Sequence, residues 1–146
     1  MREGDPVQDF EAVDHRGKAV RLSDLLLQGP VVLFFYPKAM SPGCTAEACR
    51  FRDLSGEFAG RGATVLGISP DSVEGQARFA QANQLGMPLL ADPDRRIAKR
   101  FGVGRLFGLP VRRVTFVIGR DGRVIRRIAS PLDMDQHADE ALIALP

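Results

Sequence analysis

Runs of apolar residues in the middle of the chain predict the centre of a sheet. Residues 31–36, with the sequence VVLFFY, are continuously apolar, and residues 63–69 form a second run of mainly apolar residues. Residues 88–91 make a third, shorter run. Continuous apolar runs rich in β-branched and aromatic residues are typical of strands buried on both faces of a parallel sheet. We therefore predict three buried strands.

Two further segments alternate between apolar and polar residues and indicate hairpins. Residues 9–22 alternate around the turn sequence Asp14-His15-Arg16-Gly17. Residues 114–119 and 123–128 alternate around Arg120-Asp121-Gly122. Alternation interrupted by Asp and Gly predicts antiparallel strands joined by a tight turn. One hairpin is thus expected at the start of the chain and another near its end.

The segments between the strands carry helix start and stop signals. Ser23, Ser72 and Asp92 are placed as N-caps, while Gly86 and Gly102 follow two of the helices as stop residues. Pro93 would be the first residue of its helix. The pattern predicts helical segments over residues 23–27, 42–58, 72–85, 92–101 and 135–144.

Strands that alternate with helices require a mixed sheet covered by helices on both faces. We predict an α/β protein with a thioredoxin-like fold, in which the N-terminal β-hairpin extends a central mixed sheet flanked by helices. A chain of 146 residues is long enough to bury a core without staples. We expect residues 1–146 to form a single domain.

Charge narrows the class of partners. The chain has 20 Lys and Arg against 18 Asp and Glu, a net charge of +2, which is too small to favour nucleic acid. No apolar run is long enough to span a bilayer, and the first residues lack the pattern of a signal peptide. We therefore expect no membrane partner and a cytoplasmic setting. Because thiols stay reduced there, two nearby cysteines are expected to be catalytic or metal-binding.

Cys44 lies where a reactive thiol is expected. It follows a predicted buried strand, and open α/β sheets place their sites at such strand ends. Ser41 is a good N-cap and Pro42 a good first helical residue, which puts Cys44 in the first helical turn. Helix N-termini and neighbouring cations favour the thiolate, which is the nucleophilic form of cysteine. The alternative from position alone is a buried, unreactive thiol.

The spacing of the two cysteines constrains any disulfide between them. Cys44 and Cys49 are five positions apart, so on a continuous helix their Cα atoms would be about 8.6 Å apart. A disulfide requires less than roughly 7 Å. If the two residues work as a pair, the first helical turns must unwind between the reduced and the oxidised state.

Other chemistries for these cysteines have less support. A zinc site would need a second pair of ligands, and His15 and His137 fall in a turn and in a late helix. A Cys–His protease is disfavoured because neither histidine is near a predicted strand end. Both histidines are expected on the surface.

Residues 36–53, with the sequence YPKAMSPGCTAEACRFRD, resemble the active-site segment of Q-type peroxiredoxins, the bacterioferritin comigratory proteins. The family pattern of Pro, Thr or Ser, and Cys matches Pro37, Ser41 and Cys44, although threonine is more usual than serine at the middle position. A second cysteine five positions later is typical of the subfamily and matches Cys49. The resemblance extends over nearly the whole chain.

The resemblance implies that Cys44 is the peroxidatic cysteine and Cys49 the resolving cysteine of an intramolecular disulfide. Ser41 and the helix N–H groups would bind the peroxide oxygens, and Pro37 would shield the thiolate from water.

The family pattern Arg-x-Thr/Ser-Phe also implies an arginine that steadies the thiolate and the peroxide oxygens. Arg113 matches it, with Arg112 as its rival, since adjacent strand residues point to opposite faces. Glu47 matches a family glutamate that would hold this arginine. The alternative is a carboxylate at the start of the helix that faces water.

The implied activity is a thiol peroxidase that reduces hydrogen peroxide and organic hydroperoxides and is recycled by thioredoxin or a glutaredoxin. No metal, haem or flavin is implied, and we expect a monomer, with a weak homodimer as the alternative. Two rival functions stay open. A thiol–disulfide oxidoreductase would normally separate its cysteines by two residues, whereas a redox sensor would turn over poorly with any reductant.

Overall fold

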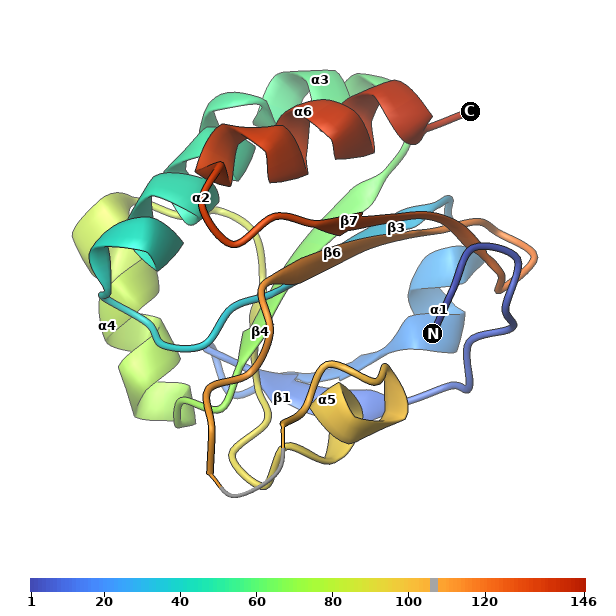
Figure 1. The fold of residues 1–146 in the computed structure, drawn as a ribbon. Coiled ribbons are helices and arrows are strands. Elements are labelled where there is room, and N and C mark those ends of the chain that lie inside the picture. The colour runs from blue at the N-terminus through green and yellow to red at the C-terminus, as the bar shows by residue number, and fades with distance from the viewer. Residues whose placement is uncertain (106–107) are drawn as a thin grey trace.

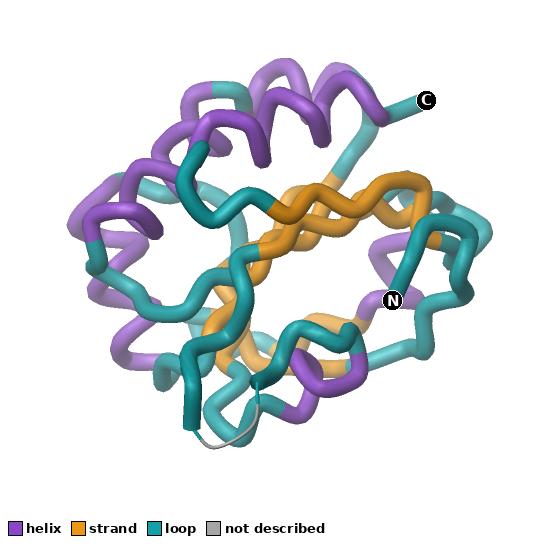
Figure 2. Tube along the Cα trace, viewed as in Figure 1, coloured by secondary structure: helices purple, strands orange, loops and turns teal. Residues whose placement is uncertain are grey.

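A computed structural model describes residues 1–105 and 108–146. Within these residues, seven strands form one sheet in the order β2-β1-β5-β4-β3-β6-β7. β3, β4 and β5 run parallel, and the other neighbours pair antiparallel. The predicted mixed sheet and both hairpins are confirmed (Figure 2). The strands are β1 Glu11–Asp14, β2 Ala19–Arg21, β3 Val31–Phe35, β4 Thr64–Ser69, β5 Leu89–Ala91, β6 Val114–Ile118 and β7 Val124–Ala129.

The central strand β3 is buried along its whole length, as its apolar run predicts. Val31, Leu33 and Phe35 pack into one core cluster with residues of α1 and α5, whereas Val32 and Phe34 pack into a second cluster with α2, α3, α4 and α6. Figure 1 shows these two groups of helices on opposite sides of the sheet. The helices are α1 Leu22–Leu26, α2 Pro42–Asp53, α3 Ser55–Gly60, α4 Val73–Asn83, α5 Arg96–Arg100 and α6 Met134–Ala144.

The single helix predicted over residues 42–58 is wrong, because the chain forms two helices that meet at Leu54. Leu54 has φ −96° and ψ 11°, outside the α-helical range. Ser55 and Gly56 follow, and both have lower helix propensity than Ala or Leu. The break leaves α2 as a separate helix that begins at the predicted site and ends eleven residues later.

Two of the predicted N-caps, Ser23 and Asp92, are not the residues that directly precede their helices. α1 begins at Leu22, and Ser23 instead uses its N–H and its hydroxyl to bind the Asp9 carboxylate, each at 2.8 Å. α5 begins at Arg96 rather than at Pro93, but the Asp92 carboxylate still accepts hydrogen bonds from two N–H groups in the first turn. An Asp side chain reaches a helix start from several residues away as long as the loop between them folds back.

The prediction for α4 is right at its start and wrong at its end. The Ser72 hydroxyl accepts a hydrogen bond of 3.1 Å from the Gly75 N–H, as an N-cap should. The helix ends at Asn83, and its C-cap residue is Gln84, which adopts the left-handed conformation with φ 54°, and not Gly86. A glutamine therefore takes the position for which glycine is usually favoured.

Candidate active site

The reactive segment joins the end of β3 to the start of α2. Ser41 occupies the N-cap position and Pro42 the first helical position, which confirms these two placements. Cys44 follows in the first turn and is fully buried. The strand-to-helix junction therefore brings the thiol next to the free N–H groups and the positive end of the α2 dipole.

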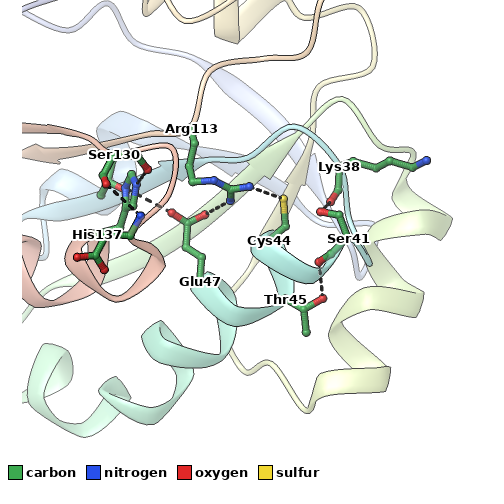
Figure 3. A network of polar contacts seen from close by, with 10 residues as sticks. Lys38, Ser41, Cys44, Thr45, Glu47, Arg113, Ser130 and His137 are labelled. Atoms are coloured by element: carbon green, nitrogen blue, oxygen red, sulfur yellow. Dashed lines mark hydrogen bonds and ion pairs between the residues drawn. The ribbon is translucent and has the colours of Figure 1, made fainter.

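Ser41 does not cap the helix with its side chain, which corrects one part of the prediction. Its hydroxyl donates a hydrogen bond of 2.8 Å to the carbonyl of Lys38. Its own carbonyl accepts bonds from the N–H and the hydroxyl of Thr45, at 2.9 and 2.8 Å. Ser41 thus ties the loop to the first turn of α2, beside Cys44 (Figure 3).

The loop before α2 is also held from the end of β4. Asp71 accepts hydrogen bonds of 2.7 Å each from the backbone N–H of Ala39 and from the hydroxyl of Ser69. Met40 has φ 69°, a conformation that is uncommon for a residue other than glycine. Pro37 is partly buried at the beginning of this loop. The loop that covers the cysteine is therefore fixed at several points.

Arg113 reaches the site from the segment just before β6. Its Nη2 lies 3.3 Å from Cys44 Sγ and its Nη1 lies 3.0 Å from Glu47 Oε1, so one guanidinium contacts both groups (Figure 3). Arg112 is exposed. Burial by itself would lower the pKa of Arg113, but the charges of Glu47 and Cys44 outweigh it and raise that pKa above its ordinary value. The cation beside the sulfur is thus fixed in its charged form.

Glu47 is fully buried one turn after Cys44, so the alternative of a carboxylate facing water is wrong. Burial raises the pKa of Glu47 from an ordinary 4.5 to about 8, although the charge and the hydrogen bond of Arg113 oppose this rise. The contact between Glu47 and Arg113 is the arrangement that the family resemblance implies, in which the glutamate holds the arginine.

His137 belongs to the same network, and the expectation that it lies on the surface is wrong. It is fully buried on α6, where its Nδ1 lies 3.3 Å from Glu47 Oε2. The same Nδ1 is 2.8 Å from the Thr115 hydroxyl, and Nε2 is 2.7 Å from the Ser130 carbonyl. Burial lowers the pKa of His137 below its ordinary 6.5.

The helical spacing of α6 contains a signal for this burial. Ala138, Ala141 and Leu145 are buried, and His137 lies on the same face, one residue before Ala138 and four before Ala141. His15, by contrast, is partly exposed in the turn between β1 and β2, and its Nδ1 accepts a hydrogen bond from the Leu89 N–H.

Cys49 lies further along α2 and faces another helix. Its sulfur is 3.9 Å from Asn83 Oδ1, at the end of α4. Both cysteines are free thiols, and the helix that carries them is continuous from Pro42 to Asp53. The structure is that of the reduced protein, before any disulfide forms.

Residues 1–105 and 108–146 contain no cluster of three or more His, Cys, Asp or Glu side chains arranged to hold a metal ion. In the same part of the chain, no helix combines the length and the apolar character needed to cross a membrane.

A buried cysteine at a strand-to-helix junction, with an arginine against its sulfur, makes a site for a protein that uses a cysteine thiolate as its nucleophile. Residues 4–127 match the AhpC/TSA family. A putative peroxiredoxin of Mycobacterium tuberculosis is 53% identical, with 99% of this chain and 96% of the relative covered. The chain therefore belongs to the AhpC/TSA family and is a thiol peroxidase, which uses a hydroperoxide substrate and a thiol reductant.

Solved structures agree in fold. The crystal structure of peroxidoxin BcpB from M. tuberculosis superposes with a TM-score of 0.96 at 53% identity, covering 99% of this chain and 96% of that one. The bacterioferritin comigratory protein of Xanthomonas campestris superposes with a TM-score of 0.86 at 28% identity, with 97% of each chain covered. That structure was solved to explain the alkyl peroxide reduction activity of the X. campestris protein. The predicted thioredoxin-like fold and the resemblance to Q-type peroxiredoxins are confirmed.

Proposed function

We propose that Cys44 is the residue that attacks the hydroperoxide and that Cys49 resolves the product as an intramolecular disulfide. The observation that carries this proposal is the contact of 3.3 Å between Arg113 Nη2 and Cys44 Sγ at the N-terminus of α2. A cation and a helix N-terminus at one sulfur both favour the thiolate.

In the first step, the Cys44 thiolate attacks one oxygen of the peroxide bond and that bond breaks. The sulfur becomes a sulfenic acid, and the leaving oxygen takes up a proton to form water or an alcohol. Arg113 and the N–H groups of the first turn stabilise the charge as it moves from sulfur to oxygen. Ser41 and Pro37 shape the loop that closes over these atoms.

In the second step, the Cys49 thiol displaces the hydroxyl from the sulfenic acid, and a disulfide and water form. On the intact α2 helix the two Cα atoms would be about 8.6 Å apart, too far for this bond. The first turns of α2 must therefore unwind, and the contact between Cys49 and Asn83 must break.

An external dithiol then reduces the disulfide by exchange. We assign this role to thioredoxin or a glutaredoxin, and we assign organic hydroperoxides to the substrates together with hydrogen peroxide. The similarity to the X. campestris protein supports the organic substrates. A cytoplasmic monomer folded as a single domain, with a weak homodimer as the alternative, completes the proposal.

The test separates the two cysteines. Cys44→Ser should lose turnover with hydrogen peroxide and with an organic hydroperoxide. Cys49→Ser should still consume one equivalent of peroxide, with one oxygen added to Cys44 by mass spectrometry, but should lose recycling by thioredoxin. Recycling of Cys49→Ser at the wild-type rate would contradict the resolving role, whereas single-turnover oxidation of Cys44→Ser would contradict the peroxidatic role.

A further inference from the structure

The two carboxylate oxygens of Glu47 have different surroundings. Oε1 accepts a hydrogen bond from Arg113, whereas Oε2 is buried and has no hydrogen bond within the described part of the chain. Nδ1 of His137 lies 3.3 Å from Oε2. A buried oxygen without a donor is costly, so the protonation of this pair needs a physical explanation.

The contacts of His137 fix where its hydrogen lies. Nε2 is 2.7 Å from the carbonyl oxygen of Ser130, which can only accept, so Nε2 must carry a hydrogen. In a neutral ring Nδ1 then has a bare lone pair, and this lone pair would face the bare Oε2 of an ionised Glu47. One proton between Nδ1 and Oε2 removes the conflict. The Thr115 hydroxyl, 2.8 Å from Nδ1, can donate or accept and therefore suits either state.

We propose that Glu47 and His137 hold one shared proton while Cys44 is a thiolate, and release it when the sulfur loses its charge. The inference rests on the proposed role of Cys44. It assigns to His137, a residue that does not touch the sulfur, the role of a positioning residue that acts through Glu47 and Arg113.

The number of buried charges around the Arg113 guanidinium explains why the Glu47–His137 pair would release its proton. Arg113 contacts the sulfur and Glu47 together, and burying a net charge is expensive. When the sulfur is a thiolate, it balances Arg113, and a protonated Glu47–His137 pair leaves the cluster neutral. When the sulfur is a sulfenic acid, the ionised Glu47 balances Arg113 instead.

Other charges around the pair are further away or already matched. Asp133 and Glu140, at the cap and on the body of α6, favour a proton on His137, whereas Arg113 disfavours it. Glu140 itself pairs with Arg126 of β7 at 3.1 Å. The raised pKa of Glu47, about 8, agrees with a proton that stays on the pair at neutral pH.

The proton count of the first step follows from this arrangement. The thiolate, the protonated pair and the hydroperoxide give the sulfenic acid, the ionised pair and an alcohol or water. The proton that the pair gives up equals the proton that the leaving oxygen gains, so oxidation of Cys44 takes no net proton from the solvent. If the pair were inert, one proton would be drawn from solvent for each thiolate oxidised.

The experiment measures this difference with a pH indicator in weakly buffered solution at pH 7. Cys49→Ser stops the reaction at the sulfenic acid, and the thiolate absorbance in the ultraviolet establishes the charge of Cys44 beforehand. Oxidation by hydrogen peroxide should take up no net proton in this variant. The double variant Cys49→Ser, Glu47→Gln is measured at a pH where the absorbance shows Cys44 to be fully ionised. Its oxidation should take up one more proton for each sulfur oxidised than the oxidation of Cys49→Ser alone.

Glu47→Gln retains the hydrogen bond to Arg113 and can donate to His137, so it mimics the protonated state. His137→Gln retains a donor for Ser130, removes the basic Nδ1 and should also change the proton count. His15→Gln is the matched control and should behave like Cys49→Ser alone. A purely structural role would slow oxidation without changing the number of protons.

Equal proton uptake by Cys49→Ser and by its combination with Glu47→Gln, or no thiolate absorbance at pH 7, would overturn the inference. Failure of Cys44 to gain an oxygen in the mass spectrum would instead contradict the proposed function. The two failures are therefore distinguishable within one experiment.

Discussion

The carboxylate of Asp71 accepts a hydrogen bond of 2.7 Å from the backbone N–H of Ala39. This bond connects the segment after β4 to the loop that precedes Cys44, two parts of the chain that are 32 positions apart. It fixes a backbone segment whose neighbour Met40 already has an uncommon conformation. The reactive loop is therefore held by a charged acceptor and does not depend on its own sequence alone.

Asp71→Ala should loosen this loop. Hydrogen bonds to charged groups contribute about 1.5–3 kcal/mol, so we expect a loss of stability of that order and a several-fold slower reaction with peroxide. Urea denaturation and the rate of Cys44 oxidation would measure the two effects. Asp24→Ala, an exposed carboxylate on α1, is the control, and an equal loss of rate in both variants would show that the contact to Ala39 is unimportant.

Arg113→Lys should keep the positive charge and lose the fork that contacts Cys44 and Glu47 together. Removing one donor from a site that stabilises developing charge typically costs about 100- to 1,000-fold in rate. We expect a loss of at least about tenfold in the second-order rate constant for peroxide, because lysine retains part of the interaction. Stopped-flow measurement of Cys44 oxidation tests this.

Arg112→Lys serves as the control for Arg113→Lys. Arg112 is exposed and adjacent in sequence, so the same substitution there should leave the rate near that of the wild type. A similar loss at both positions would show that the effect arises from the segment before β6 and not from the contact with the sulfur.

Gly43→Ala tests how closely the first turn of α2 fits against the guanidinium. A Cβ at this position would lie 3.2 Å from Arg113 Nη2 and 3.6 Å from the sulfur of Met134. The arginine would have to move by a few tenths of an ångström, so peroxide reduction should slow several-fold. Stability should change by no more than ~1 kcal/mol, because alanine favours the helix.

Gly56→Ala in α3 is the matched control, since a Cβ there meets nothing within 4 Å. It should stabilise the protein slightly in thermal unfolding and leave the rate unchanged. If Gly43→Ala reacts as fast as Gly56→Ala, the close approach to Arg113 has no part in the reaction.

Glu47 should make the reduced protein less stable as the pH rises toward 8. Its folded pKa of about 8 lies above its ordinary 4.5, so its contribution to stability is complete below 4.5 and is lost as the pH rises to 8. The lowered pKa of His137 acts in the opposite direction, and its contribution is lost as the pH falls below 6.5. The effect of Glu47 is therefore isolated between pH 6.5 and 8 as the difference in stability between the wild type and Glu47→Gln.

In that window the free energy of unfolding should fall by up to about 1.4 kcal/mol per pH unit relative to Glu47→Gln. Urea denaturation of both proteins under reducing conditions at several pH values measures the difference. Parallel curves for the two proteins would contradict the raised pKa of Glu47.

The sequence predicts the sheet well because its central strands are marked by composition alone. Residues 31–36 are apolar and rich in β-branched and aromatic residues, which favours a strand buried on both faces, and β3 is buried throughout. Helix ends are less predictable, since they depend on single residues. Gln84 ends α4 in a conformation for which glycine is usual, and Leu54 divides a segment that lacks a strong stop signal.

In the active site, a placement that depends on neighbouring residues could be predicted from the sequence, whereas a contact between distant segments could not. The placement of Cys44 in the first turn of α2 follows from Ser41 and Pro42, which are its neighbours in sequence. The burial of His137 against Glu47 joins α6 to α2, which are far apart in the chain, and no local pattern around either residue indicates the contact. Only the shared helical face with Ala138 and Ala141 points to the burial of the histidine.

Glu47 lies between the two cysteines along α2. Because Glu47 lies in the segment that would unwind for Cys44 and Cys49 to meet, we expect the proposed disulfide state to lose the contact between Glu47 and Arg113. The disulfide and the assembled peroxide site would thus not be present at the same time. A second peroxide molecule would not react until a reductant had reduced the Cys44–Cys49 disulfide and the first turns of α2 had formed again.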